Sequence, residues 1–147
     1  MAKAAKKVPA KKAAAKKAPA SQSIVGLAPY LTIDGAAKAI AFYGKAFGAE
    51  EVMRMPGQDG KKLMHAHIRI NGGNVLMSDH FGDAKAPKPV GVTVHLQVDD
   101  ADKWWNRAVK AGARVKMPIA DQFWGDRYGQ LTDPFGHSWS IGGPGKK

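Results

Sequence analysis

The chain has 147 residues, enough for one domain of average size with a proper core. It contains no cysteine, which excludes disulfides, thiolate metal sites and thiol nucleophiles. No apolar run approaches the roughly 20 residues of a membrane span, and no signal-peptide core is visible. We therefore expect a soluble, cytoplasmic protein with no membrane partner.

The net charge of +11 is concentrated at the amino terminus. Seven of the 23 Lys and Arg residues lie in residues 1–20, which leaves 16 basic against 12 acidic residues elsewhere. Because this segment consists almost wholly of Lys, Ala and Pro, we expect residues 1–22 to form a disordered basic tail. Mobile lysines bind phosphate backbones without reading sequence, so the tail is either nucleic-acid-binding, and hence nucleoid-associated, or merely solubilising. The candidate contacts are Lys6, Lys7, Lys11, Lys12, Lys16 and Lys17.

The first half of the folded part begins with a predicted strand over residues 24–33. Asp34 is then expected to cap a helix, whose apolar residues recur at helical spacing until Gly48 ends it. Three further strands are predicted, over residues 51–55, 63–70 and 74–79. In the second of these, apolar residues alternate with His65, His67 and Arg69, which places both histidines on one face.

The same order of elements returns after a linker at residues 81–89. A strand ending at Val98 precedes a helix that Asp99 or Asp100 caps, and a final hairpin turns at Asp133–Gly136. Residues 30–40 align with residues 95–105 at a constant offset of 65, with matching apolar and Asp positions. We therefore predict a domain over residues 23–147 that contains two duplicated modules, at about residues 24–80 and 90–143.

Two halves of strand, helix and three strands resemble the vicinal oxygen chelate superfamily, which includes glyoxalase I, bleomycin-resistance proteins and extradiol dioxygenases. The segments AFYGKAFGAE and FWGDRYG…LTDPFGHSWS are most similar to its PhnB-like subfamily. The resemblance implies an α+β fold in which two βαβββ modules curl their sheets into an incomplete barrel around a cavity. It also implies a homodimer.

The metal enzymes of this family hold a divalent ion through His or Glu at two positions in each module. The aligned positions here are Ala28, Met77, Thr93 and Ser140. None of these is a usual ligand for a divalent metal, so we predict that the family's metal site is missing and that no cofactor is held. A different divalent-metal site at His65 and His67, with Asp79 or His80 as a third ligand, is an open alternative.

The resemblance places a ligand cavity on the sheet face opposite the helices. The predicted lining consists of Tyr30, Thr32, Met77, Asp79, His95, Gln97, Trp124, Arg127, Tyr128 and Ser140. Arg127 is expected to grip a carboxylate or phosphonate, or to pair with Asp126. His95, placed near Asp79, is the candidate general base.

Three functions follow from these observations. The first is a binding protein that sequesters a small molecule, with anions among the candidates, as bleomycin-resistance proteins do. The second is a metal-dependent lyase or dioxygenase-type enzyme with non-standard ligands. The third is a nucleic-acid-associated protein whose tail binds DNA. No Ser-His-Asp order or pair of carboxylates fixes a reaction, so the sequence leaves catalysis open.

Overall fold

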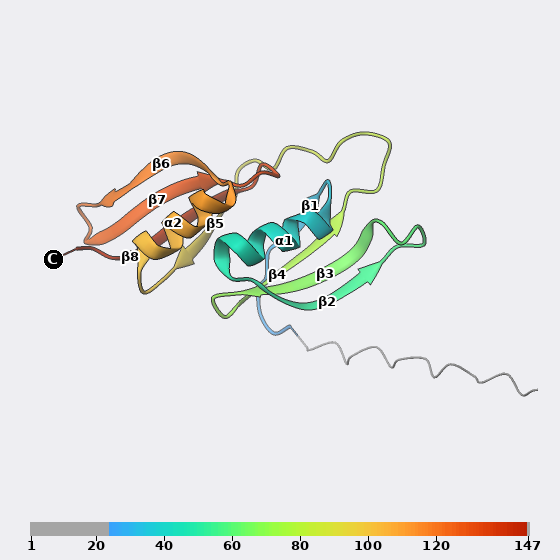
Figure 1. Ribbon diagram of the computed structural model, residues 1–147, viewed down its shortest axis with the longest axis horizontal. Coiled ribbons are helices and arrows are strands. Elements are labelled where there is room, and N and C mark those ends of the chain that lie inside the picture. Colours follow the sequence, from blue (N-terminus) through green and yellow to red (C-terminus); the bar gives the residue numbers. More distant parts are fainter. Residues whose placement is uncertain (1–23, 147) are drawn as a thin grey trace, which may run out of the picture.

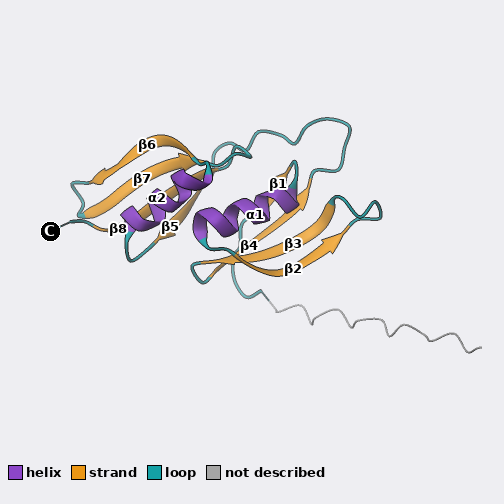
Figure 2. Ribbon diagram, in the orientation of Figure 1, coloured by secondary structure: helices purple, strands orange, loops and turns teal. Residues whose placement is uncertain are grey.

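The computed structural model describes residues 24–146 and has an α+β fold of two similar modules side by side (Figure 1). Each module is a four-stranded sheet with one helix packed on it (Figure 2). The lysines of residues 1–20 lie outside the described residues, so the nucleic-acid role of the tail stays a prediction. Within residues 24–146, no helix is long and apolar enough to cross a membrane.

The predicted repeat of element order is confirmed. The first module consists of β1 (Tyr30–Ile33), α1 (Ala36–Phe47), β2 (Glu50–Pro56), β3 (Leu63–Ile70) and β4 (Gly73–Asp79). The second consists of β5 (Thr93–Gln97), α2 (Ala101–Ala111), β6 (Arg114–Asp121), β7 (Asp126–Thr132) and β8 (Ser138–Pro144). The sheet orders are β1-β4-β3-β2 and β5-β8-β7-β6, and each first strand runs parallel to the last strand of its module. The two sheets do not close into a barrel.

The predicted first strand is too long. It begins at Tyr30, and residues 24–29 are not in a strand. Gly26 has a positive φ of 87°, and Pro29 has no N–H to donate to a neighbouring strand. Pro29 still accepts a hydrogen bond of 2.9 Å from the Leu76 N–H, so pairing with β4 starts at its carbonyl.

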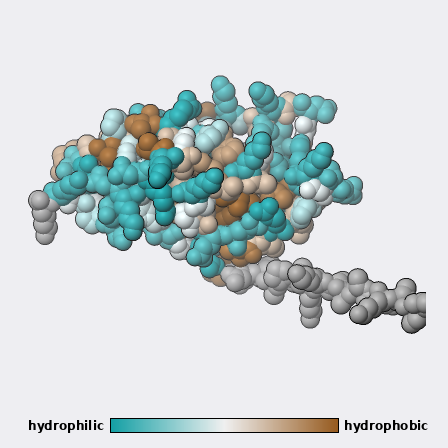
Figure 3. Space-filling model, in the orientation of Figure 1, coloured by the Kyte–Doolittle hydropathy of each residue, from teal (hydrophilic) through white to brown (hydrophobic). Residues whose placement is uncertain are grey.

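One apolar core runs through both modules. The predicted stripe of α1 is buried, with Tyr43 and Phe47 at 0% and 1% exposure. Both rings contact Trp139 of the second module, with ring centroids 5.3 and 4.7 Å apart. In the orientation of Figure 1, hydrophilic side chains cover most of the surface, as expected when both helices turn their apolar sides inward (Figure 3).

The predicted turn at Asp133–Gly136 is present and also joins the modules. The buried Asp133 carboxylate accepts hydrogen bonds from the backbone N–H groups of Phe135 and His137, both at 2.9 Å. It also accepts from the Tyr43 hydroxyl at 2.7 Å and the Trp139 indole at 2.8 Å. Burial alone would raise the pKa of Asp133, but its contacts with His137, Tyr43 and Trp139 hold that pKa below the usual value. Burial, followed by the charge of Asp133, raises the pKa of Tyr43.

The prediction that Asp34 caps the first helix is wrong. Gly35 occupies the cap position, and the carboxylate that accepts from the helix start belongs to Asp79. Its Oδ1 accepts from Gly35 N at 2.8 Å and from Ala36 N at 3.0 Å, while its Oδ2 accepts from Leu63 N at 2.7 Å. The parallel pairing of β1 with β4 sets Asp79 opposite Ile33, just before the helix. Asp34 instead accepts from Ala86 N in the linker.

The other predicted helix ends are confirmed. Asp100 caps α2 and accepts from the Lys103 N–H at 3.0 Å. Gly48 and Gly112 end the two helices in the left-handed conformation, at φ 63° and 116°.

Candidate small-molecule site on the open face of the second sheet

The face of the second sheet that points away from α2 carries no Asp, Glu, Lys or Arg at its centre. Alternation along the strands turns every second residue to this face, and the register of β5, β8 and β7 aligns them in three rows. The rows are Thr93–Ser138–Thr132, His95–Ser140–Gln130 and Gln97–Gly142–Tyr128. We call these nine positions the open face.

His95 is the centre of the hydrogen-bond network on the open face. Its Nδ1 lies 2.8 Å from the Ser140 hydroxyl, and its Nε2 lies 2.9 Å from the Gln97 Oε1. Because the Gln97 Oε1 only accepts, Nε2 donates to it, and in the neutral ring Nδ1 then accepts from the Ser140 hydroxyl. The ring stacks on Tyr128 at 6.0 Å. A Cβ at Gly142 would approach the His95 ring to 2.9 Å, so glycine makes room for this packing.

The contacts of His95 do not complete a catalytic relay. A serine, a histidine and an orienting acceptor have the connectivity of a nucleophile and its base. However, Ser140 is only 2% exposed, so its hydroxyl is not presented to a substrate. The predicted neighbour Asp79 is not near His95, because it is buried at the start of α1 in the first module. The network therefore holds the ring in place, and a role of His95 as general base stays a prediction.

Aromatic rings extend the open face towards the loop between β6 and β7. Trp124 packs edge-on against Tyr128 at 5.8 Å and 69°, and Phe123 packs edge-on against Trp124 at 5.0 Å and 88°. Trp124 is 50% exposed and Phe123 97%. Trp124 lies in the turn before β7, where the Gly125 N–H donates to the Gln122 carbonyl. Phe123 was absent from the predicted lining, although its place beside Trp124 before a glycine was a usable signal.

The predicted placement of Arg127 is wrong. Since Tyr128 faces the open side, its neighbour Arg127 must face α2. Its Nε donates to both Asp102 oxygens at 2.8 Å, and its Nη1 lies 3.4 Å from Asp121. The hydrogen bond with Asp102 raises the pKa of Arg127, and hydrogen bonds from Lys146 and Arg127 lower the pKa of Asp102. The partners of Arg127 are therefore Asp102 and Asp121, not Asp126, and Arg127 is not placed to bind an anion beside His95.

Met77 and Asp79 also point away from the predicted cavity. Both are buried on the helix side of β4, Met77 at 0% exposure. Tyr30 pairs with Leu76 as His95 pairs with Ser140, so the structural counterpart of Ser140 is Leu76. The alignment that equated Met77 with Ser140 was therefore displaced by one residue in this strand. The corrected residue, Leu76, is also no metal ligand.

His65 and His67 both have hydrogen-bond partners on the open side of the first sheet. His65 Nδ1 lies 3.2 Å from the Tyr30 hydroxyl, and His67 Nε2 lies 2.9 Å from the Asn74 Oδ1. The proposed third ligand Asp79 is directed to the helix start. Among residues 24–146, no group of three or more His, Cys, Asp or Glu is arranged to hold a metal ion. The possibility that this pair binds a metal stays a prediction.

Among the hollows where the modules meet, two are lined in part by Gln97. His95 and Gln97 border a cavity of about 320 Å³, whose other walls are Leu27, Pro29, Ile70, Asn71, Gly73, Asn74, Val75, Val94, Leu96 and Trp139. Trp124 and Tyr128 are not part of that lining. The cavity is at the lower end of the usual range for ligand pockets.

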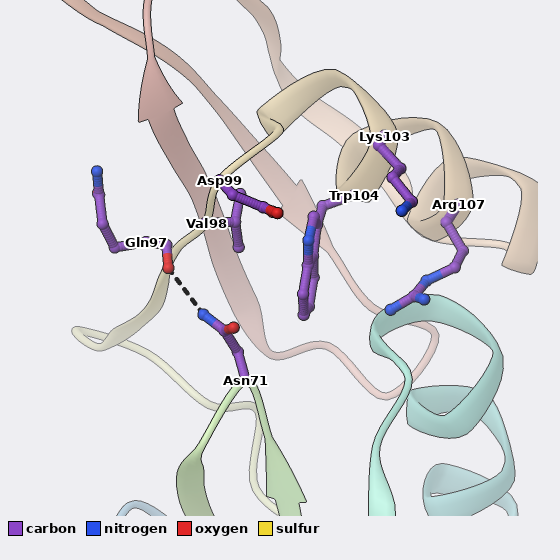
Figure 4. A pocket seen from close by; sticks show the side chains of 7 residues that line it. All are labelled: Asn71, Gln97, Val98, Asp99, Lys103, Trp104 and Arg107. Atoms are coloured by element: carbon purple, nitrogen blue, oxygen red, sulfur yellow. Dashed lines mark hydrogen bonds between the residues drawn. The ribbon is translucent and has the colours of Figure 1, made fainter.

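The second hollow, of about 480 Å³, lies beside α2 (Figure 4). Its lining is Asn71, Gln97, Val98, Asp99, Lys103, Trp104 and Arg107. Its polar groups connect the modules: Asn71 donates to the Gln97 carbonyl at 2.8 Å, and Arg107 donates to the Ala46 carbonyl at 2.9 Å. The Arg107 guanidinium also lies 4.9 Å from the Trp104 ring. Because these contacts are internal, we assign this hollow to the junction of the modules and not to a ligand.

Comparison with known proteins gives a consistent result. The model of the glyoxalase/bleomycin resistance protein/dioxygenase superfamily matches residues 24–141. An uncharacterised protein of Mycobacterium bovis is 50% identical over 126 residues, which cover 80% of this chain and 82% of that protein. A Pseudomonas aeruginosa crystal structure matches 84% of this chain and all of that chain, with a TM-score of 0.67 and 25% identity. The match to the structure of the PhnB protein from Bacillus cereus covers 80% of this chain and 98% of that chain, with a TM-score of 0.60. At 18% sequence identity, this match shows a shared fold alone.

Proposed function

The chain belongs to the glyoxalase/bleomycin resistance protein/dioxygenase superfamily, and we propose that it binds a small organic molecule at the open face, around His95, without a metal ion. The observation that carries the proposal is the network of His95, Ser140, Gln97 and Tyr128 beside a cavity of about 320 Å³. Aromatic walls with a few fixed polar groups are typical of ligand sites.

The proposal includes a second copy of the chain that covers the open face. In one copy this face is open, and the Phe123 ring at its end is almost fully exposed. Burial of such a ring stabilises an association. The resemblance of the sequence to this family also implied a homodimer. Light scattering of the full chain should therefore give twice the mass of one copy, and a strictly monomeric protein at high concentration would contradict this part of the proposal.

The site is tested by mapping bound fragments with two-dimensional NMR on the full chain. We expect the amide shifts caused by a binding fragment to cluster at His95, Gln97 and Tyr128. Tyr128→Leu should weaken that fragment about fivefold or more, since loss of one stacked ring removes about 1 kcal/mol or more. Lys38→Ala, on the exposed side of α1, is the matched control and should change nothing.

The same titration distinguishes binding from the metal-dependent alternative. Addition of a chelator should leave the fragment affinity unchanged if the site needs no metal. Affinity that disappears with the chelator and returns with Mn²⁺, with line broadening at His65 and His67, would favour the lyase or dioxygenase alternative. Shifts confined to other parts of the molecule would overturn the proposed site.

A further inference from the structure

We infer that the open face takes an uncharged, planar aromatic molecule whose edge carries an amide-like pair of donor and acceptor. The inference rests on the proposed function and replaces the anionic ligand expected from the sequence. It follows from three features of the face: its charge, the angles between its rings and the polar atoms that its own hydrogen bonds leave unused.

The charge of the open face is unfavourable for an anion. None of the nine central positions is Asp, Glu, Lys or Arg, and Arg127 is paired with Asp102 on the other side of the sheet. The next residue of β7 on the aromatic side is Asp126, paired with Pro144, and it carries a negative charge. Arg114 pairs with Thr132, two rows away from Tyr128 at the opposite end. An anion beside Tyr128 would therefore lose water, find no Lys or Arg among the nine central positions and be repelled by Asp126.

The rings of Trp124 and Tyr128 form a corner that suits a flat ligand. Their planes meet at 69°, with centroids 5.8 Å apart. A flat ring placed in such a corner stacks on one wall and presents its edge to the other, and both are favourable aromatic geometries. Trp124 is 50% exposed, so part of its surface is available for this contact.

The hydrogen bonds within the face leave both a donor and an acceptor unused. Tyr128 accepts from the Gln130 Nε2 at 3.0 Å, which leaves the Tyr128 hydroxyl hydrogen to donate and the Gln130 side-chain oxygen to accept. Gln97 uses its oxygen for His95, which leaves its amide N–H groups to donate. A neutral amide edge on the ligand, which also donates and accepts, matches these groups.

The first module shows why this site belongs to the second. Tyr30 occupies the place of His95, and its ring lies 5.8 Å from His65, so a histidine and a tyrosine pair in both sheets. In the first module, however, the pair is joined directly, with the Tyr30 hydroxyl 3.2 Å from His65 Nδ1. The tyrosine there uses its hydroxyl within the protein, whereas the Tyr128 hydroxyl hydrogen is unused.

The test compares nicotinamide with nicotinate, which share one ring and differ in charge at neutral pH. Each is titrated into the full chain by NMR at moderate salt, so that non-specific attraction of nicotinate to the basic tail is screened. We expect nicotinamide to bind about tenfold or more tightly than nicotinate, with shifts at Gln97, Tyr128 and the Trp124 indole. Trp124→Ala should reduce the nicotinamide affinity about tenfold, and Lys38→Ala should leave it unchanged.

The outcomes separate this inference from the proposed function. If nicotinate binds the open face as tightly as nicotinamide, the inference of a neutral ligand is wrong, although the site itself is supported. If only a saturated molecule such as cyclohexane carboxylate binds there, the inference of a planar aromatic ligand is wrong, and the site is again supported. If neither class of probe shifts the resonances of His95, Gln97 or Tyr128, the proposed function fails together with the inference.

Discussion

Replacing Asp133 by Ala is expected to lower the free energy of unfolding by about 3–5 kcal/mol, which makes it one of the most damaging single changes in this chain. The Asp133 carboxylate is 1% exposed and accepts from two backbone N–H groups, the Tyr43 hydroxyl and the Trp139 indole. Its removal leaves those buried donors unpaired at the point where the modules join. Urea unfolding of the full chain measures the loss.

Two further variants make the Asp133 prediction specific. Tyr43→Phe removes a single hydrogen bond to a charged group and should destabilise by about 1.5–3 kcal/mol. Asp83→Ala is the matched control, because Asp83 is exposed in the linker. A loss below about 1 kcal/mol for Asp133→Ala would show that the turn tolerates unpaired donors, and the account of the module junction would then be wrong.

The pH dependence of the free energy of unfolding gives a second test of the role of Asp133. The pKa of Asp133 is lowered in the folded protein, so its contribution to stability is fully present above the usual carboxyl pKa of about 3.9. That contribution is lost as the pH falls from there through the lower folded pKa. The wild-type stability should therefore drop below about pH 4 more steeply than that of Asp133→Asn, which lacks this ionisation.

The sequence correctly predicted the features that depend on residues close together along the chain. The apolar stripe of α1, the glycine ends of both helices and the repeat of element order depend on periodicity within short windows, and the structure has all of them. The strand β5 was also placed correctly on its two faces. With Val94 and Leu96 directed to the core, His95 and Gln97 necessarily face the other way.

The errors concern residues whose orientation depends on distant pairing. Because side chains alternate along a strand, Arg127 and Tyr128 must lie on opposite faces of the sheet. Only the pairing of β7 with β8 and of β8 with β5 decides which of the two shares a face with His95. A displacement of one residue in the last strand of the first module likewise exchanged Met77 for Leu76. Such a shift moves a side chain to the opposite face, and turn patterns alone did not fix the register to that precision.

The role of Asp79 also depends on distant pairing, because β4 must pair with β1 before Asp79 can reach the start of α1. Its carboxylate accepts from Gly35, Ala36 and Leu63, so it satisfies the start of α1 and the start of β3 at once. Asp79→Ala should therefore lower the free energy of unfolding by about 3 kcal/mol, because three largely buried N–H groups lose their acceptor. Asp79→Asn, which keeps one oxygen, should lose less.

The matched variant is Asp34→Ala, which removes the residue that local pattern selects as the cap. Asp34 is exposed and accepts only from the Ala86 N–H among the described residues, so its loss should cost about 1 kcal/mol or less. The order of the two losses decides which aspartate caps α1. Folded Asp79→Ala protein should also bind nicotinamide as tightly as the wild type, because its position is structural and lies in the other module. A folded variant with normal stability and lost binding would restore Asp79 to the ligand site and overturn the assignment of that site to the second sheet alone.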